Sequence, residues 1–181
     1  MALVAWWVLR QADAGITASE DLMTIHTAPM PTEAPSGKVA YELSRLLADT
    51  YTLQLKTQGY NWNVSGPHFP ALHLLFEQEY VELRDAVDEI AERIRALGPL
   101  APGSYRQLSR LTSLAEDEGA PAALEMVRRL ASDHEAVAVT ARSVLEAAEA
   151  VGDAATLDLA TRRVAVHEKT YWMLRATADE S

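Results

Sequence analysis

The side chains best suited to chemistry lie in one stretch of this 181-residue chain. His73 and Glu77 form one pair and Asp88 and Glu92 a second, and the members of each pair are four residues apart. In a helix, residues at this spacing are neighbours. Imidazole and carboxylate together suit iron, manganese or zinc. The pattern predicts metal binding; the alternatives are a solvated acidic face for the carboxylates and a packed or interface role for the histidine.

The two pairs are too far apart to share an ion within one chain. They are separated by 88 − 73 = 15 residues, and a helix rises ~1.5 Å per residue, which places them roughly 22 Å apart. A two-fold axis that runs this helix antiparallel to its own copy would bring His73 and Glu77 of one chain to Asp88 and Glu92 of the other. The spacing therefore favours a metal site between subunits, formed twice.

A long helix from about 69 to 97 must carry both pairs. Its apolar residues recur three and four apart and form one stripe facing a core: Phe69, Phe76, Tyr80, Leu83, Val87, Ile90, Ile94 and Leu97. The four potential ligands share a second face on the flank of that stripe, together with Leu74 and Val81. A second face that mixes apolar and charged residues indicates a partner.

These residues resemble the signature of Dps, the DNA-binding protein from starved cells, a ferritin-like miniferritin. The matching positions are Leu55-Lys56-Thr57, Trp62-Asn63-Val64, Gly66, Phe69, Leu72-His73, Phe76-Glu77, Tyr80, Asp88 and Ala91-Glu92-Arg93-Ile94. The similarity extends over roughly 38–177, through Asp133-His134 and His167-Glu168-Lys169. The resemblance implies an all-α four-helix bundle, a hollow shell of twelve subunits and a ferroxidase site at the two-fold interface, with His73, Glu77, Asp88 and Glu92 as ligands.

One position departs from the family pattern. The residue before the motif tryptophan is a metal-binding histidine in most of the family, and here it is Asn61. Asn61 and His73 are expected to face each other across the Gly66-Pro67 turn. An amide oxygen binds a divalent transition metal more weakly than imidazole does. We therefore expect a site that binds iron more weakly, or through a bridging water. His68, in the turn, is not expected to substitute.

The remaining elements fit the same architecture. A first helix is predicted from about 37 to 64, a short one near 104–111, a third from about 121 to 150 and a fourth from an Asp153 cap to about 177. Four long helices with one long crossover, which contains the short extra helix, match a ferritin-like bundle. The Glu-x-x-His signature of an in-bundle di-iron centre is absent from the sequence. His134 and His167 are therefore interpreted as packing or capping residues.

Residues 1–37 differ in kind from the rest. They open with MALVAWWVL, a run too short to span a bilayer and without the basic region and cleavage site of a signal peptide. We interpret 1–37 as a flexible extension, or as the product of a misassigned start with Met23 or Met30 as the true one. The Dps-like domain is expected at 38–178. The absence of cysteine fits a reducing cytoplasm, and the acidic net charge disfavours anionic membranes, so a cytoplasmic location and no membrane association are expected.

The net charge of the chain indicates which kinds of partner it can bind. The formal net charge is −10, which favours attraction of cations and disfavours nucleic acid. Before Lys38 the only basic residue is Arg10, and the chain ends in 178–181 with Asp179 and Glu180. DNA binding is therefore not expected, although it gives the family its name. Glu146, Glu149 and Asp153 are interpreted as a solvated acidic face, with an iron-entry pore as the alternative.

The sequence thus leads to an iron-storing miniferritin hypothesis. The resemblance implies that Fe²⁺ is oxidised at the two-fold site, preferentially by hydrogen peroxide, and stored as ferric mineral, which protects against oxidative stress. The alternatives are a passive iron shell and a non-catalytic nucleoid scaffold whose iron site is impaired by Asn61.

Overall fold

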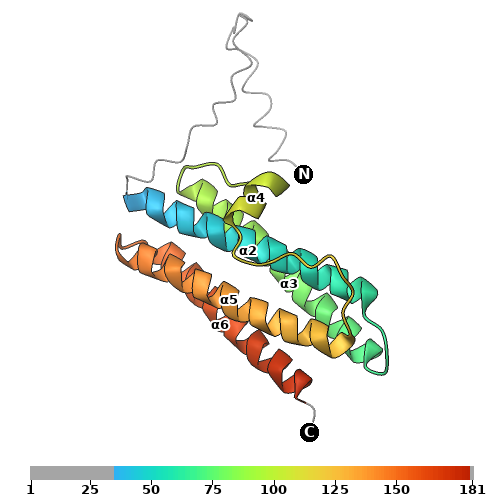
Figure 1. Ribbon diagram of the computed structural model, residues 1–181. Helices are drawn as coiled ribbons and strands as arrows, with labels where there is room; N and C mark the ends of the chain where they lie inside the picture. The colour runs from blue at the N-terminus through green and yellow to red at the C-terminus, as the bar shows by residue number, and fades with distance from the viewer. Residues whose placement is uncertain (1–34, 180–181) are drawn as a thin grey trace, which may run out of the picture.

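The computed structural model describes residues 35–179 and shows five helices. These are α2 (Pro35–Asn63), α3 (Phe69–Ala96), α4 (Tyr105–Leu111), α5 (Ala123–Glu149) and α6 (Ala154–Ala178). The four long helices form a bundle and short α4 lies outside it against α2 (Figure 1). The all-α four-helix fold with an extra short helix is confirmed. The predicted extension 1–37 lies outside the described residues, except for its last three residues, which already belong to α2.

The bundle consists of two helical hairpins. Helices α2 and α3 pack along each other, as do α5 and α6, and α2 also packs on α5 (Figure 1). The inner face of α2 packs into the core, where five of its residues are buried: Val39, Leu43, Leu46, Leu47 and Leu53. Among residues 35–179 no helix is both long and apolar enough to cross a lipid bilayer.

The apolar stripe of α3 is confirmed along its centre, while its members Tyr80, Val87 and Leu97 are only partly buried. Phe76, Leu83, Ile90 and Ile94 are fully buried. Phe69 was expected in the core but is 42% exposed. It is the first residue of α3, beyond the end of the core, and its ring stacks on the imidazole of His73 with a centroid distance of 5.1 Å.

A tight turn joins α2 to α3 and sets the relative position of the helices that carry the predicted site. Gly66 has φ of 100°, a backbone conformation that is strained for residues with a Cβ atom. The amide of Phe69 donates to the carbonyl of Gly66 at 3.0 Å. This turn fixes where α3 begins relative to the end of α2, and so places Asn61 against His73.

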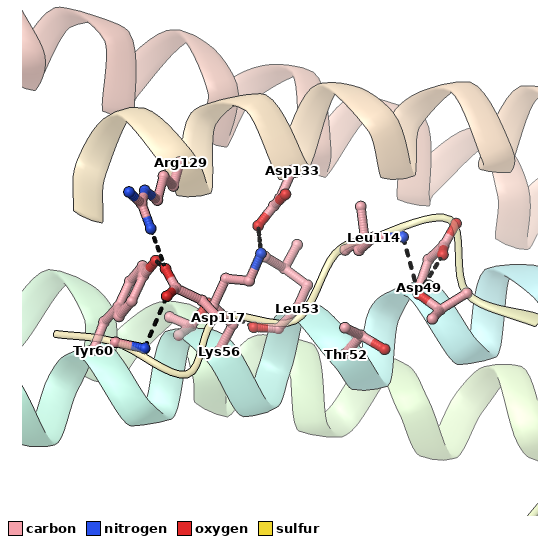
Figure 2. A network of polar contacts seen from close by, with 12 residues as sticks. Asp49, Thr52, Leu53, Lys56, Tyr60, Leu114, Asp117, Arg129 and Asp133 are labelled. Carbon is pink, nitrogen blue, oxygen red and sulfur yellow. Dashed lines mark hydrogen bonds and ion pairs between the residues drawn. The ribbon is translucent and has the colours of Figure 1, made fainter. Parts of the chain in front are cut away.

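Buried Asp49 of α2 fastens the long connection that follows α3 (Figure 2). Its carboxylate accepts hydrogen bonds from Thr112 Oγ1 at 2.9 Å, from Ser113 N at 2.6 Å and Oγ at 3.0 Å, and from Thr140 Oγ1 of α5 at 2.7 Å. Each of the two carboxylate oxygens thus accepts two hydrogen bonds. One side chain thus holds α2, the connection and α5 together.

Two more contacts tie α2 to α5 (Figure 2). Lys56 Nζ donates to Asp133 Oδ2 at 2.6 Å. The hydroxyl of Tyr60 donates to Asp117 in the connection, and Arg129 Nη1 donates to the same carboxylate at 2.7 Å. Hydrogen bonds from Tyr60, from a backbone amide and from Arg129 lower the pKa of Asp117 to about 2. The end of α2 next to Asn61 is therefore firmly anchored.

Candidate metal centre

All four predicted ligands lie on α3 and are accessible in the single chain. Glu77, Asp88 and Glu92 are exposed and His73 is partly exposed. Leu74, on the same face, is 54% exposed. The mixed apolar and acidic face that the sequence predicts for a partner is thus accessible on α3.

Asn61 and His73 face each other and are joined by two reciprocal hydrogen bonds. The amide Nδ2 of Asn61 donates to the backbone carbonyl of His73 at 2.7 Å. His73 Nδ1 lies 2.9 Å from the backbone carbonyl oxygen of Asn61. Because a carbonyl oxygen only accepts, His73 must carry a proton on Nδ1 in this arrangement. The lone pair of Nε2 is then free, which is the arrangement usual for a metal-ligating histidine.

The buried side chain of Asn61 is engaged in connecting two helices. Asn61 is 5% exposed, and its amide nitrogen is directed to the backbone of α3. The expected position of Asn61 opposite His73 is confirmed. The contact between them is a pair of hydrogen bonds that joins α2 to α3. The neighbouring Trp62 is 66% exposed and adds apolar surface beside these hydrogen bonds.

Two arginines close to the second ligand pair in the sequence, Arg93 and Arg95, bind other groups and do not neutralise it. Arg93 donates to both carboxylate oxygens of Asp153, at 2.7 and 2.8 Å, and to Thr156 Oγ1 at 2.8 Å. Arg95 donates to the backbone carbonyls at 98 and 99. Glu92 is therefore paired with neither Arg93 nor Arg95.

The described chain does not assemble a metal site alone. Within residues 35–179, no three or more His, Asp or Glu side chains are grouped so that they could hold a metal ion. The pairs on straight α3 remain about 22 Å apart by helical rise. Any site that uses both pairs must therefore draw on a second chain.

Three of the other sequence candidates, Asp153, His134 and His167, serve structural roles, and His68 does not. Asp153 is the N-cap of α6, because its side chain accepts from Thr156 N at 3.1 Å, as predicted. His68 is exposed at the start of α3 and makes no side-chain capping bond there. His134 and His167 are buried against each other, with their Nδ1 atoms 2.9 Å apart. Their interpretation as packing residues agrees with this burial.

Sequence reasoning missed several polar core residues, and Glu79 is one of them. It is 9% exposed and its carboxyl oxygens have no hydrogen-bond partner among the described residues. Burial, reinforced by the charge of nearby Glu82, raises the pKa of Glu79 to about 8. A signal existed: Glu79 lies three residues after Phe76 and four before Leu83, which is a position on the apolar stripe.

Comparison with known proteins agrees with this architecture. The fold and the acidic helix face define a ferritin-like protein, and the model of the Ferritin-like domain family matches residues 41–180. The chain belongs to this family, and within it to the Dps family.

The relatives that show this membership cover most of the chain. The chain is 34% identical to DNA protection during starvation protein 2 of Bacillus anthracis, over 74% of this chain and 92% of that protein. It is 39% identical to a low temperature-induced protein of Nostoc, over 74% and 76%. The crystal structure of a Dps protein from Vibrio cholerae, described as a ferritin-like diiron-carboxylate protein, superposes with a TM-score of 0.78 at 30% identity, over 80% of this chain and 91% of that chain.

Proposed function

We propose that the protein is an iron-sequestering miniferritin that oxidises Fe²⁺ at a site between two subunits and stores the ferric product inside a hollow homo-oligomeric shell. The observation that carries the proposal is the open face of α3. It presents two ligand pairs about 22 Å apart, and no metal-binding group of three such side chains forms within the described part of one chain. Family membership supports iron as the metal.

Antiparallel pairing of α3 around a two-fold axis would complete the site. His73 and Glu77 from one subunit would meet Asp88 and Glu92 from the other, and the same contact would form twice. One imidazole and three carboxylates form a donor set that suits Fe²⁺. Three negative charges also favour Fe³⁺ over Fe²⁺ by electrostatics, so the ligands themselves promote oxidation.

The reaction balances with hydrogen peroxide as the oxidant. Two Fe²⁺ ions each give up one electron, the O–O bond of one peroxide molecule accepts both and breaks, and two protons complete two water molecules. Iron is the substrate, and the part of the chain is to bind and orient it. Consuming Fe²⁺ and peroxide together would limit formation of hydroxyl radicals, which is the protective role proposed here.

In this proposal Asn61 is a positioning residue. Its backbone carbonyl accepts the Nδ1 proton of His73 at 2.9 Å, which directs Nε2 to the metal. The side-chain Nδ2 of Asn61 donates a hydrogen bond to the backbone carbonyl oxygen of His73 at 2.7 Å. The site would therefore have one imidazole fewer than is usual in the family, and we propose weaker iron binding as the consequence.

The shell itself is proposed from the family and from exposed apolar side chains. Trp62 and Leu74 lie on the α2–α3 side, and Trp172 and Met173 on α6, with exposed fractions of 66%, 54%, 65% and 39%. Such residues need neighbours, and twelve subunits are what the family resemblance implies. A shell of subunits with a net charge of −10 would attract Fe²⁺ and would repel DNA at physiological salt.

Anaerobic addition of Fe²⁺ to the assembled protein, followed by hydrogen peroxide, tests the proposal through ferric absorbance. The double variant Asp88→Ala/Glu92→Ala should lose the fast phase. Glu118→Ala/Glu135→Ala, which removes two exposed carboxylates elsewhere, should keep it. Equal rates in all three proteins, matching iron in buffer, would leave only the passive shell or the scaffold.

The variant Asn61→His separates a weakened catalyst from a passive store. If oxidation takes place at the two-fold site, the added imidazole should tighten Fe²⁺ binding and speed oxidation. The variant also removes the hydrogen bond that the Asn61 side chain donates to the backbone of α3. Light scattering must therefore first show that the variant still assembles. An intact variant that oxidises iron no faster would count against a catalytic two-fold site.

A further inference from the structure

A groove lies on the outer side of the bundle, between α2, α4 and the connection that leads to α5. It has a volume of about 590 Å³, which is in the range of pockets that enclose a bound ligand. Short α4 forms one wall (Figure 1), where the ring of Tyr105 meets that of Tyr51 edge to face at a centroid distance of 6.2 Å. The apolar lining includes Tyr51, Leu55, Trp62, Tyr105, Leu108 and Leu114.

Three large side chains of this lining are exposed. The exposed fractions are 66% for Trp62, 60% for Tyr105 and 37% for Leu55. Exposed apolar side chains that gather in one groove mark a binding site for an apolar partner.

The charged residues of the groove restrict what this partner can be. Lys56 and Asp117 line the groove but are each paired with an oppositely charged side chain of α5 (Figure 2). The two remaining charged residues of the lining, Glu116 and Glu118, are exposed on the connection and form an acidic rim. The groove therefore fits an apolar segment that is followed by a basic residue.

A segment of this description stands at the start of the chain, outside the described residues. Residues 1–9, MALVAWWVL, contain no charged side chain and are followed by Arg10. Trp6 and Trp7 supply much of the apolar surface, since an enclosed tryptophan buries roughly 150–250 Å². Arg10 is the only lysine or arginine before Lys38, so it is the residue that an acidic rim attracts.

The chain between this segment and α2 is long enough to reach the groove. Tyr51 and Trp62 lie 51 − 35 = 16 and 62 − 35 = 27 residues after Pro35, which is roughly 24 and 40 Å along α2. Residues 11–34 are 24 in number; such a length reaches at most about 80 Å, and a random coil of this length spans about 25–30 Å. This match gives the segment a high local concentration at the groove of its own chain.

We propose that residues 1–10 bind in this groove of their own chain, with the two tryptophans against its apolar lining and Arg10 at its acidic rim. The apolar run covers the exposed side chains of the groove, and the arginine balances the two carboxylates. Bound there, the segment fastens α4 to α2, next to the end of α2 that carries Asn61.

Introduced cysteine pairs test this contact in the full assembled chain, because the sequence contains no cysteine. Trp7→Cys combined with Leu55→Cys should form a disulfide within one chain about tenfold faster, or more, than Trp7→Cys combined with Val139→Cys. Val139 is the matched control, since it is an apolar residue of α5 that is 57% exposed and is not part of the groove. Non-reducing gels and mass spectrometry measure the two rates. Equal rates, or disulfides formed chiefly between chains, would overturn the proposal.

Tryptophan fluorescence tests the burial of the segment independently. The background variant Trp62→Phe/Trp172→Phe leaves Trp6 and Trp7 as the only tryptophans of the chain. In this background, acrylamide should quench the fluorescence several-fold less than it quenches free tryptophan. Quenching as strong as that of free tryptophan would contradict the proposal.

A change in the groove shows whether the segment is buried there. In the same background, Leu55→Glu should raise the quenching toward that of free tryptophan, while the control Val139→Glu should leave it low. Light scattering must first show that both variants assemble. Low quenching that Leu55→Glu leaves unchanged would place the segment elsewhere and overturn the proposal.

Hydrogen exchange distinguishes this segment from a second copy of the chain as the occupant. In the full chain, Trp6→Ser/Trp7→Ser should make the amides of residues 105–111 exchange several-fold faster than in the wild type. Met23→Ser/Met30→Ser, which removes two apolar side chains outside the segment, should have no effect. Unchanged exchange in the tryptophan variant would mean that another subunit covers the groove. None of these measurements uses iron, so their outcome is independent of the proposed iron oxidation.

Discussion

Removing the carboxylate of Asp153 is predicted to loosen the junction between α3 and α6. Asp153 caps α6 by accepting from Thr156 N at 3.1 Å and from Thr156 Oγ1 at 2.6 Å. The same carboxylate binds Arg93 of α3 at 2.7 and 2.8 Å. One side chain therefore serves both as a helix cap and as the tie to the helix end that carries Glu92.

The magnitude follows from these two roles. Loss of an N-cap costs about 1 kcal/mol, and loss of a charge-assisted hydrogen bond about 1.5–3 kcal/mol. The side chains of Arg93 and Asp153 are 22% and 14% exposed, so solvent screens the ion pair only in part. Asp153→Ala should therefore lower the free energy of unfolding by about 2–4 kcal/mol. Asp153→Asn, which keeps a capping oxygen, should lose about half as much.

Thermal unfolding at fixed protein concentration measures the effect. In a chain of this size each kcal/mol shifts the midpoint by about 2–4 °C, so Asp153→Ala should melt roughly 5–15 °C lower. Asp158→Ala on the same helix is the control, because its ion pair with Arg162 is exposed and contributes ~0–1 kcal/mol. If Asp153→Ala melted no lower than Asp158→Ala, the assignment of this junction would be refuted.

Three further outcomes are expected. Asp49→Asn should destabilise the fold by about 3 kcal/mol or more, because a neutral amide replaces a buried carboxylate with four donors; chemical denaturation would show it, and an unchanged midpoint would contradict it. Tyr60→Phe should raise the pKa of Asp117 from about 2. The lowered pKa of Asp117 contributes folding stability that is lost as the pH falls, so the variant should begin to lose stability at a higher pH than the wild type. An unchanged dependence of unfolding on acid pH would count against the contact. Gel shifts over a range of salt should show no binding to duplex DNA near physiological salt, because residues 1–37 and 178–181 carry little positive charge; a robust shift there would restore the scaffold alternative.

The sequence was sufficient for the helices and for one close contact of the site. The three-and-four spacing of apolar residues places α3 within one residue of its observed end at Ala96, because this periodicity directly reflects the buried face. The Gly66-Pro67 turn was enough to bring Asn61 opposite His73, since a short turn leaves little freedom in how two helices align.

Contacts between distant segments could not be predicted in the same way. Arg93 lay beside Glu92 in the sequence, yet it binds Asp153, sixty residues later. Glu79 occupies a position on the apolar stripe, but only the approach of α5 and α6 reveals that it faces His134. Pairings of this kind depend on how helices pack in three dimensions, and helical periodicity carries no information about that.

Mixed assembly tests the central claim most directly, because it asks whether the site is shared between chains. One variant lacks His73 and Glu77, the other lacks Asp88 and Glu92, and each alone should have no fast Fe²⁺ oxidation. When the two are unfolded, mixed in equal amounts and reassembled, half of the two-fold pairs should be hybrids, and each hybrid should have one intact site. The account predicts recovery of about a quarter of the wild-type fast phase. No recovery in assemblies shown to be mixed would contradict a site built from both subunits.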